Sequence, residues 1–158
     1  MKILVLNCGS SSVKYKLIDM NTKEELGSGG VEKIGLKGSF LKHKRRDGQK
    51  VTLKGEVLEH QIAIEYILGV LTSEKHGCIA SLDEINAVGH RLVHGGEKFN
   101  KSVLIDDEVI ANIVECIDMA PLHNPPNLAG IRAVNELMPD VPQVGVFDTA
   151  FHQTMPDH

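Results

Sequence analysis

The sequence predicts one α/β domain with a mixed sheet, an N-terminal β-hairpin and flanking helices. Two strand-like segments near the N-terminus, residues 3–7 and 13–20, are separated only by a Gly/Ser turn. Further strand-like segments follow, and after residue 60 helix-like and strand-like segments alternate, which is typical of α/β architecture. A length of 158 residues suits a single domain.

The N-terminal part of the chain is rich in predicted strands. Each of these segments is either a short apolar run or an alternation of apolar and polar residues, as in a half-buried strand. The basic run at residues 42–46 is interpreted as a solvated hairpin or loop, because the rest of the chain is acidic. The glycine cluster at 27–30 indicates a turn or a bulge. The predicted strands here are residues 3–7, 13–20, 25–34 and 49–53.

The rest of the chain alternates predicted helices with predicted strands. Residues 60–71 carry apolar side chains at three- and four-residue spacing, which predicts an amphipathic helix. Asp106 can cap a second helix. Asn124 and Pro125 provide the cap and first-turn proline of a third helix, which stops at Pro139. Two apolar segments are predicted as strands, residues 85–93 and 143–147.

Composition argues against several classes of partner. The formal net charge is −4, with 17 Lys and Arg against 21 Asp and Glu, so there is no overall cationic field to bind nucleic acid. Three cysteines without a CxxC motif predict reduced thiols in a cytoplasmic protein, not a disulfide framework. No apolar run is long enough for a signal sequence or a membrane span, so we expect no membrane partner.

The first candidate site is the Gly/Ser turn at residues 8–12, followed by Lys14. Backbone N–H groups and serine hydroxyls in such a turn suit phosphate oxygens. Lys14 can add a point charge from the strand that follows. The segment is not a Walker A loop, because its spacing differs and a strand follows it, where a Walker A loop leads into a helix. The alternative interpretation is a plain hairpin turn with Lys14 facing solvent.

Arg91 is a charged residue in an otherwise apolar predicted strand, on the face opposite His90 and Leu92. It either pairs with a structural carboxylate or binds an anion through its guanidinium group, which can hold a carboxylate or phosphate by two hydrogen bonds. Val93 shares its face and could supply an apolar wall. His90 and His94 lie roughly 13 Å apart on a strand, which is too far to share a metal ion.

Two further segments complete the candidate site. Residues 120–127 are rich in proline and lead into a helix N-terminus, where free N–H groups favour anions. Simple capping is the alternative there. Asp148 ends the last predicted strand, where α/β folds place functional groups, and it could bind Mg²⁺, orient a nucleophile or cap a turn. Together, these groups suit phosphoryl transfer to a small carboxylate.

Four segments resemble the acetate kinase family, of the acetate and sugar kinase/Hsp70/actin superfamily: NCGSSSVKY (7–15), GHRLVHGGEKF (89–99), APLHNPPNL (120–128) and VFDTAFHQTMP (146–156). The resemblance spans residues 1–156 and implies a ribonuclease H-like, actin-like ATPase domain. Family members are more than twice as long. Residues 1–158 are therefore expected to be the N-terminal acyl-substrate and phosphate-binding domain, without the C-terminal nucleotide-binding domain, and inactive alone.

The resemblance also implies a reaction and a role for each residue. The family reversibly transfers the γ-phosphoryl group of ATP to acetate, giving acetyl phosphate and ADP, with Mg²⁺ or Mn²⁺, and a cytoplasmic homodimer is expected. Propionate or another short acyl substrate, pyrophosphate as donor, and a non-catalytic actin-like binding module remain alternatives. The implied roles are metal binding for Asn7, phosphate or ATP binding for Ser10, Ser12 and Lys14, substrate binding for Arg91, Val93, Leu122 and His123, and catalysis for Asp148.

Overall fold

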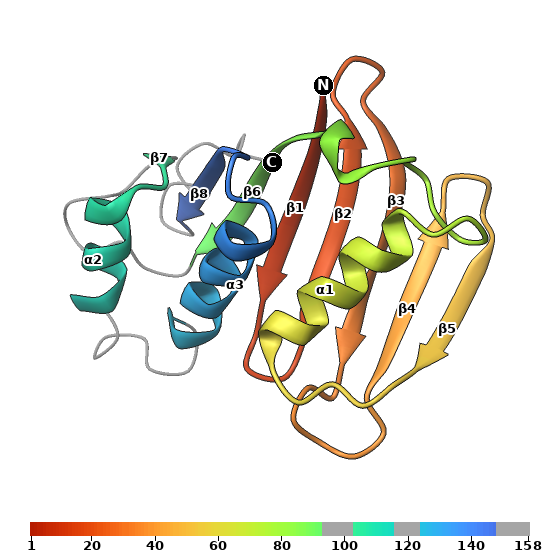
Figure 1. Cartoon of the computed structure of the whole chain (residues 1–158), viewed down its shortest axis with the longest axis horizontal. Coiled ribbons are helices and arrows are strands. Elements are labelled where there is room, and N and C mark those ends of the chain that lie inside the picture. The colour runs from red at the N-terminus through yellow and green to blue at the C-terminus, as the bar shows by residue number, and fades with distance from the viewer. Residues whose placement is uncertain (93–102, 116–123, 148–158) are drawn as a thin grey trace, which may run out of the picture.

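The computed structural model describes residues 1–92, 103–115 and 124–147, which form one mixed sheet with helices packed against it (Figure 1). The eight strands follow the order β5-β4-β3-β2-β1-β6-β8-β7. Their bounds are β1 Lys2–Cys8, β2 Val13–Asp19, β3 Glu24–Glu32, β4 Phe40–Arg45, β5 Lys50–Lys54, β6 Ile85–Leu92, β7 Val103–Leu104 and β8 Gln143–Phe147.

The sheet combines an antiparallel half with a parallel half. Strands β1 to β5 form an antiparallel meander, which confirms the predicted N-terminal hairpin. Strand β6 runs parallel to β1, and β8 runs parallel to β6, while β7 pairs antiparallel with β8. The predicted mixed sheet is therefore confirmed. The helices are α1 His60–Leu71, α2 Asp107–Glu115 and α3 Asn124–Leu137, with a short 3₁₀ turn at Leu82–Glu84.

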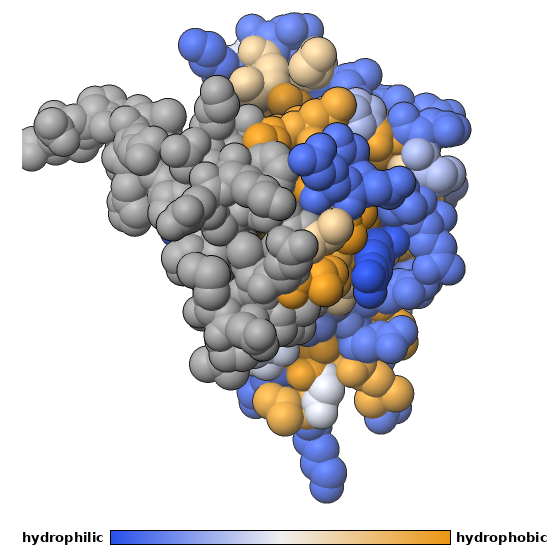
Figure 2. All heavy atoms as spheres, turned by 90° about the vertical axis from the view of Figure 1, so that its left-hand side faces the viewer, coloured by the Kyte–Doolittle hydropathy of each residue, from blue (hydrophilic) through white to orange (hydrophobic). Residues whose placement is uncertain are grey.

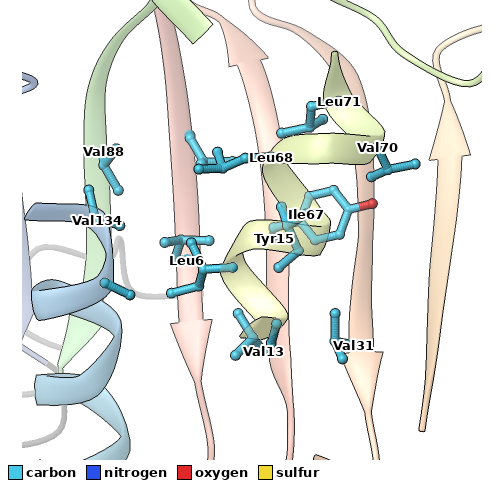
Figure 3. Packing of buried hydrophobic residues seen from close by; sticks show 14 of the residues in the cluster. Leu6, Val13, Tyr15, Val31, Ile67, Leu68, Val70, Leu71, Val88 and Val134 are labelled. Carbon is cyan, nitrogen blue, oxygen red and sulfur yellow. The ribbon is translucent and has the colours of Figure 1, made fainter. Parts of the chain in front are cut away.

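The main core lies between one face of the sheet and helices α1 and α3 (Figure 1). Alternate residues of β1 and β2 point into it, as the period of two along a strand requires. The opposite face is more exposed, and Lys14 and Lys16 of β2 lie on it. Burial on one face only therefore leaves the other face for polar groups. Figure 3 shows part of this core, with Leu6, Val13, Tyr15, Val31, Val88, Ile67, Leu68, Val70, Leu71 and Val134 labelled.

A smaller apolar cluster joins α2 and α3 to the end of β6. It contains Leu92, Val109, Ile113, Leu128 and Ile131. Figure 2 views the molecule from this side, where hydrophobic residues are visible beside the grey ones. None of the described helices combines the length and the apolar character needed to cross a membrane.

The interpretation of the basic run at residues 42–46 as a solvated hairpin or loop is wrong in part. Most of the run lies in strand β4, and His43 is only 2% exposed. His43 Nδ1 lies 2.6 Å from the Tyr15 hydroxyl, and its Nε2 lies 3.0 Å from the His76 carbonyl. Because a carbonyl only accepts, Nε2 donates and Nδ1 accepts from Tyr15. Partners on other elements therefore allow this polar side chain to be buried.

The glycine cluster at 27–30 lies inside strand β3. It is not a turn, although the pairing of β2 with β3 shifts register beside Gly27, as a bulge does. Gly29 has a φ of 156°, and a Cβ there would collide with the Lys42 carbonyl oxygen and lie 3.0 Å from the Tyr15 hydroxyl. The cluster thus provides the space in which strand β3 passes the buried Tyr15–His43 pair.

Candidate phosphate and carboxylate site

Strand pairing brings three of the predicted site residues to one face of the sheet. Asn7 of β1 lies opposite Lys14 of β2 in the hairpin register. Leu6 of β1 pairs with His90 of β6, and both are buried under the helices. Asn7 follows Leu6 on β1, and Arg91 follows His90 on β6. Because side chains alternate along a strand, Asn7 and Arg91 both point to the opposite face, where Arg91 is exposed. An amide, an ammonium and a guanidinium therefore share one polar face.

The β1–β2 turn extends this group of donors. It is tight, with the Gly9 N–H donating to the Ser12 carbonyl at 2.8 Å. The Ile34 N–H donates to the Ser11 carbonyl at 2.9 Å, which fixes the turn to the chain after β3. Ser10 is exposed and Ser12 is half-buried, so the turn presents hydroxyl groups at the end of β1. Hydroxyl groups of this kind can donate to phosphate oxygens, although no residue of the turn has the positive φ of a backbone N–H nest.

Gly30 of β3 is a site neighbour that sequence reasoning did not assign. It pairs with Lys14, and a Cβ at Gly30 would lie 3.4 Å from Lys14 Cγ and 3.1 Å from the Val13 carbonyl oxygen. Contacts of this length are tight, so a larger residue at this position would crowd the lysine stem. The signal in the sequence was the cluster 27–30, but its pairing partner could not be found without the sheet register.

His90 anchors strand β6 directly beside Arg91. Its Nε2 donates to Gln143 Oε1 of β8 at 2.6 Å, and both residues are buried. Burial lowers the pKa of His90 to about 4, and the hydrogen bond to Gln143 opposes this shift in part. His90 is therefore a neutral residue that ties β6 to β8, while Arg91 carries the charge on the other face.

The second turn of α3 lies close to the end of β1. A Cβ at Gly130 would lie 2.6 Å from Cys8 Sγ, so the helix and the strand make a close contact. Burial raises the pKa of the Cys8 thiol to about 12, which makes it a packing residue. Asn127, one turn before Gly130, is 3% exposed, and its Nδ2 has no hydrogen-bond partner within the described residues. The sequence pattern indicates only the backbone of this helix end as a donor.

Four predicted site residues, Val93, Leu122, His123 and Asp148, lie outside the described residues. Within the described part of the chain, no group of three or more His, Cys, Asp or Glu side chains is placed to hold a metal ion. A cavity of about 640 Å³ lies elsewhere, beside β4 and β5, and the predicted site residues do not line it. The described part of the candidate site is thus an open, cationic wall on the sheet face.

The sequence of this chain is similar to those of known proteins. The acetokinase family matches residues 2–158 of the chain. The acetate kinase of Azobacteroides pseudotrichonymphae genomovar. CFP2 is 76% identical over 157 residues, which cover 99% of this chain and 40% of that protein. The acetate kinase of Bacteroides thetaiotaomicron is 63% identical over 158 residues, which cover 100% of this chain and 40% of that protein. The chain thus spans 40% of the length of these relatives.

Solved structures show the same fold. The crystal structure of Porphyromonas gingivalis acetate kinase has a TM-score of 0.92 at 62% identity, covering 99% of this chain and 39% of that one. A propionate kinase from Francisella tularensis subsp. tularensis SCHU S4 has a TM-score of 0.85 at 45% identity, covering 98% of this chain and 38% of that one. The expected actin-like α/β fold is confirmed, and the chain belongs to the acetokinase family.

Proposed function

We propose that this chain is the N-terminal, acyl-substrate and phosphate-binding part of an acetate kinase. The reaction is the reversible transfer of the γ-phosphoryl group of ATP to acetate, giving acetyl phosphate and ADP. The observation that carries the proposal is the common face of Asn7, Lys14 and Arg91 beside the serine turn. Close relatives named acetate kinase support it. A homodimeric, cytoplasmic full-length enzyme is part of the same proposal and rests on family resemblance.

Each residue of the described wall has a role in this proposal. Arg91 holds the carboxylate of acetate, or the phosphate of acetyl phosphate, by two parallel hydrogen bonds. Lys14 and the hydroxyls of Ser10 and Ser12 bind phosphate oxygens along the path of transfer. Acetate is already an anion, so its oxygen attacks without first losing a proton. Positioning of the two anions and neutralisation of their charge then account for most of the reduction in the activation free energy.

The remaining assignments concern residues outside the described part of the chain. Val93 and Leu122 form an apolar wall around the methyl group of acetate, and His123 supports the site beside them. Asp148 is the carboxylate close to the reacting oxygens. These roles rest on the family resemblance of the segments that contain the four residues.

The donor set fits a magnesium or manganese ion held with the nucleotide. Mg²⁺ usually keeps several waters and binds one or two protein oxygens together with substrate phosphates. Asn7 offers a neutral side-chain oxygen on the polar face, and Asp148 would add a carboxylate. When bound, the ion neutralises charge on the transferred phosphoryl group.

Propionate is the main alternative substrate. A propionate kinase of known structure shares 45% of its sequence with this chain. One additional methylene in an apolar pocket changes discrimination by only about 1–3 kcal/mol. Comparison of kcat/KM for acetate and propionate, with ATP and then pyrophosphate as donor, decides the substrate class. Absence of phosphoryl transfer under all these conditions would favour the non-catalytic actin-like module.

The proposal is tested by Arg91→Ala in the full-length protein. We expect kcat/KM for acetate to fall about a hundredfold or more, because charged hydrogen bonds to the carboxylate are lost. The melting temperature should change little, because Arg91 is exposed. Arg91→Lys should recover only part of the activity, since an ammonium lacks the planar fork.

Arg132→Ala is the matched control, because Arg132 is an exposed arginine of α3. It should retain the activity of the unmodified protein. Turnover of Arg91→Ala equal to that of this control would remove Arg91 from the site and count against the proposed function.

A further inference from the structure

His60 links helix α1 to the serine turn. It is the first residue of α1, and its Nε2 lies 2.6 Å from the Gly9 carbonyl oxygen, 51 residues away in the sequence. A carbonyl can only accept, so Nε2 is the donor in this hydrogen bond. The bond therefore connects helix α1 directly to the β1–β2 turn.

Within the described residues, this bond adds a third contact to two backbone hydrogen bonds that fix the turn. Two backbone bonds, from Gly9 to Ser12 and from Ile34 to Ser11, fix its internal shape and its distance from β3. Neither bond relates the turn to the helical layer, whereas the bond from His60 does. Helix α1 itself is held in the core by Ile64 and by other buried residues of the same face. His60 thus links the turn by a hydrogen bond to a helix that the core holds in place.

His60 is not needed to cap its own helix. The N-cap residue of α1 is Glu59, and its side chain makes no capping hydrogen bond. The imidazole of His60 reaches away from the helix backbone, to the carbonyl of Gly9. Its hydrogen bond therefore serves the turn.

We infer that His60 is a positioning residue for phosphate binding, which holds the Gly9 carbonyl so that Ser10 and Ser12 stay aligned with the phosphate. The inference rests on the proposed function. Misplacement of a binding group by about 1 Å can reduce turnover about a hundredfold. Loss of one hydrogen bond of about 1 kcal/mol corresponds to a several-fold to tenfold effect. We therefore expect a loss of about tenfold in kcat/KM for ATP.

The test uses the full-length protein with a set of substitutions at His60. In His60→Gln the amide nitrogen takes the place of Nε2, so kcat/KM for ATP should stay within about threefold. In His60→Asn the amide nitrogen lies nearer the place of Nδ1 and falls short of Gly9, and kcat/KM should fall about tenfold. His76→Asn, beyond the other end of α1, is the control and should behave as the unmodified protein.

Two readouts separate positioning from stability. Hydrogen exchange of the amides of residues 9–12 should accelerate in His60→Asn but not in His60→Gln, while the melting temperatures stay similar. If neither exchange nor kcat/KM changes in His60→Asn, the inference is overturned. Activity losses in both variants that follow their melting temperatures would overturn it as well. If the unmodified protein transfers no phosphoryl group but the exchange pattern appears, the proposed function fails while the positioning of the turn by His60 stands.

Discussion

At the scale of single residues, His90 and Arg91 are adjacent but have opposite environments. His90 is buried and donates to Gln143, whereas Arg91 lies on the exposed face. Burial favours the neutral imidazole and lowers the pKa of His90 to about 4, against about 6.5 in an unfolded chain. The structural residue and the proposed ligand-binding residue can therefore be tested by different measurements.

His90 should make folding stability depend on pH. Between pH 6.5 and pH 4 the unfolded chain binds a proton at His90 that the folded chain does not. The contribution of His90 is thus present above pH 6.5 and is lost as the pH falls toward 4. From pH 7 to pH 5 we expect a loss of about 2 kcal/mol in the free energy of unfolding. Urea unfolding of the protein and of His90→Gln at both pH values measures it.

His90→Gln is the appropriate comparison because it retains a donor for Gln143 and does not titrate. The buried His43, whose pKa is also lowered by burial, is present in both proteins, so its effect cancels. Equal pH dependence of the two proteins would show that His90 is not the source of the acid sensitivity.

Sequence alternation predicted the opposite faces of His90 and Arg91 but could not predict the burial of His43. The first follows from the period of two within one strand. The second depends on the Tyr15 hydroxyl and the His76 carbonyl, which are brought to His43 by other elements. The neighbouring residues of a basic run do not indicate partners that are distant in the sequence. The charge pattern therefore predicted that His43 is exposed to solvent.

At the scale of elements, strong periodicity or a clear cap located most segments. Helix α1 occupies the predicted residues, and Asp106 Oδ1 accepts from the Val109 N–H at 2.9 Å at the start of α2. The predicted end of α3 at Pro139 agrees with its last residue, Leu137. Strand β7 was missed because two residues, Val103 and Leu104, cannot show a period.

Two glycines offer a matched test of element packing. Gly29→Ala should lower the free energy of unfolding by about 2–3 kcal/mol, because the new methyl group collides with the Lys42 carbonyl. Gly69→Ala, at an exposed position in the last turn of α1 with open space around it, should raise that free energy by about 0.5–1 kcal/mol. Urea unfolding measures both, and effects of the same sign would contradict the described packing of β3.

The contact between α3 and β1 predicts a compensating pair of substitutions. Gly130→Ala alone should lower the free energy of unfolding by about 1–3 kcal/mol, because the methyl group would lie 2.6 Å from Cys8 Sγ. Cys8→Ala removes that sulfur atom, so the double variant should recover at least about 1 kcal/mol of this loss. A double-mutant cycle in urea measures the coupling, and simple additivity would mean that the two residues do not touch.

At the scale of the whole molecule, the parallel order β1-β6-β8 creates the candidate site. It places the end of β6, with Arg91, beside the end of β1 and the serine turn. Local sequence patterns predicted each motif but not the order of the strands in the sheet. The sequence of one strand does not specify which distant strand will pair with it. The family resemblance supplied the grouping, and the strand register places Asn7, Lys14 and Arg91 on one face of the sheet.

The open, cationic site on the sheet face leads to a prediction for the activity of the 158 residues when they are produced alone. The chain spans 40% of the length of the acetate kinase of Azobacteroides pseudotrichonymphae genomovar. CFP2. We propose, from the family resemblance alone, that the nucleotide is bound by the part of the enzyme beyond these residues. Phosphoryl transfer requires both anions to be aligned and neutralised at once, which a single open wall cannot achieve. We therefore expect no acetyl phosphate from residues 1–158 with acetate, ATP and Mg²⁺, while the full-length protein forms it under the same conditions. Trapping acetyl phosphate as its hydroxamate measures both, with circular dichroism to establish that the 158 residues are folded. Acetyl phosphate formation by the folded 158 residues alone would contradict the assignment of nucleotide binding to the rest of the enzyme.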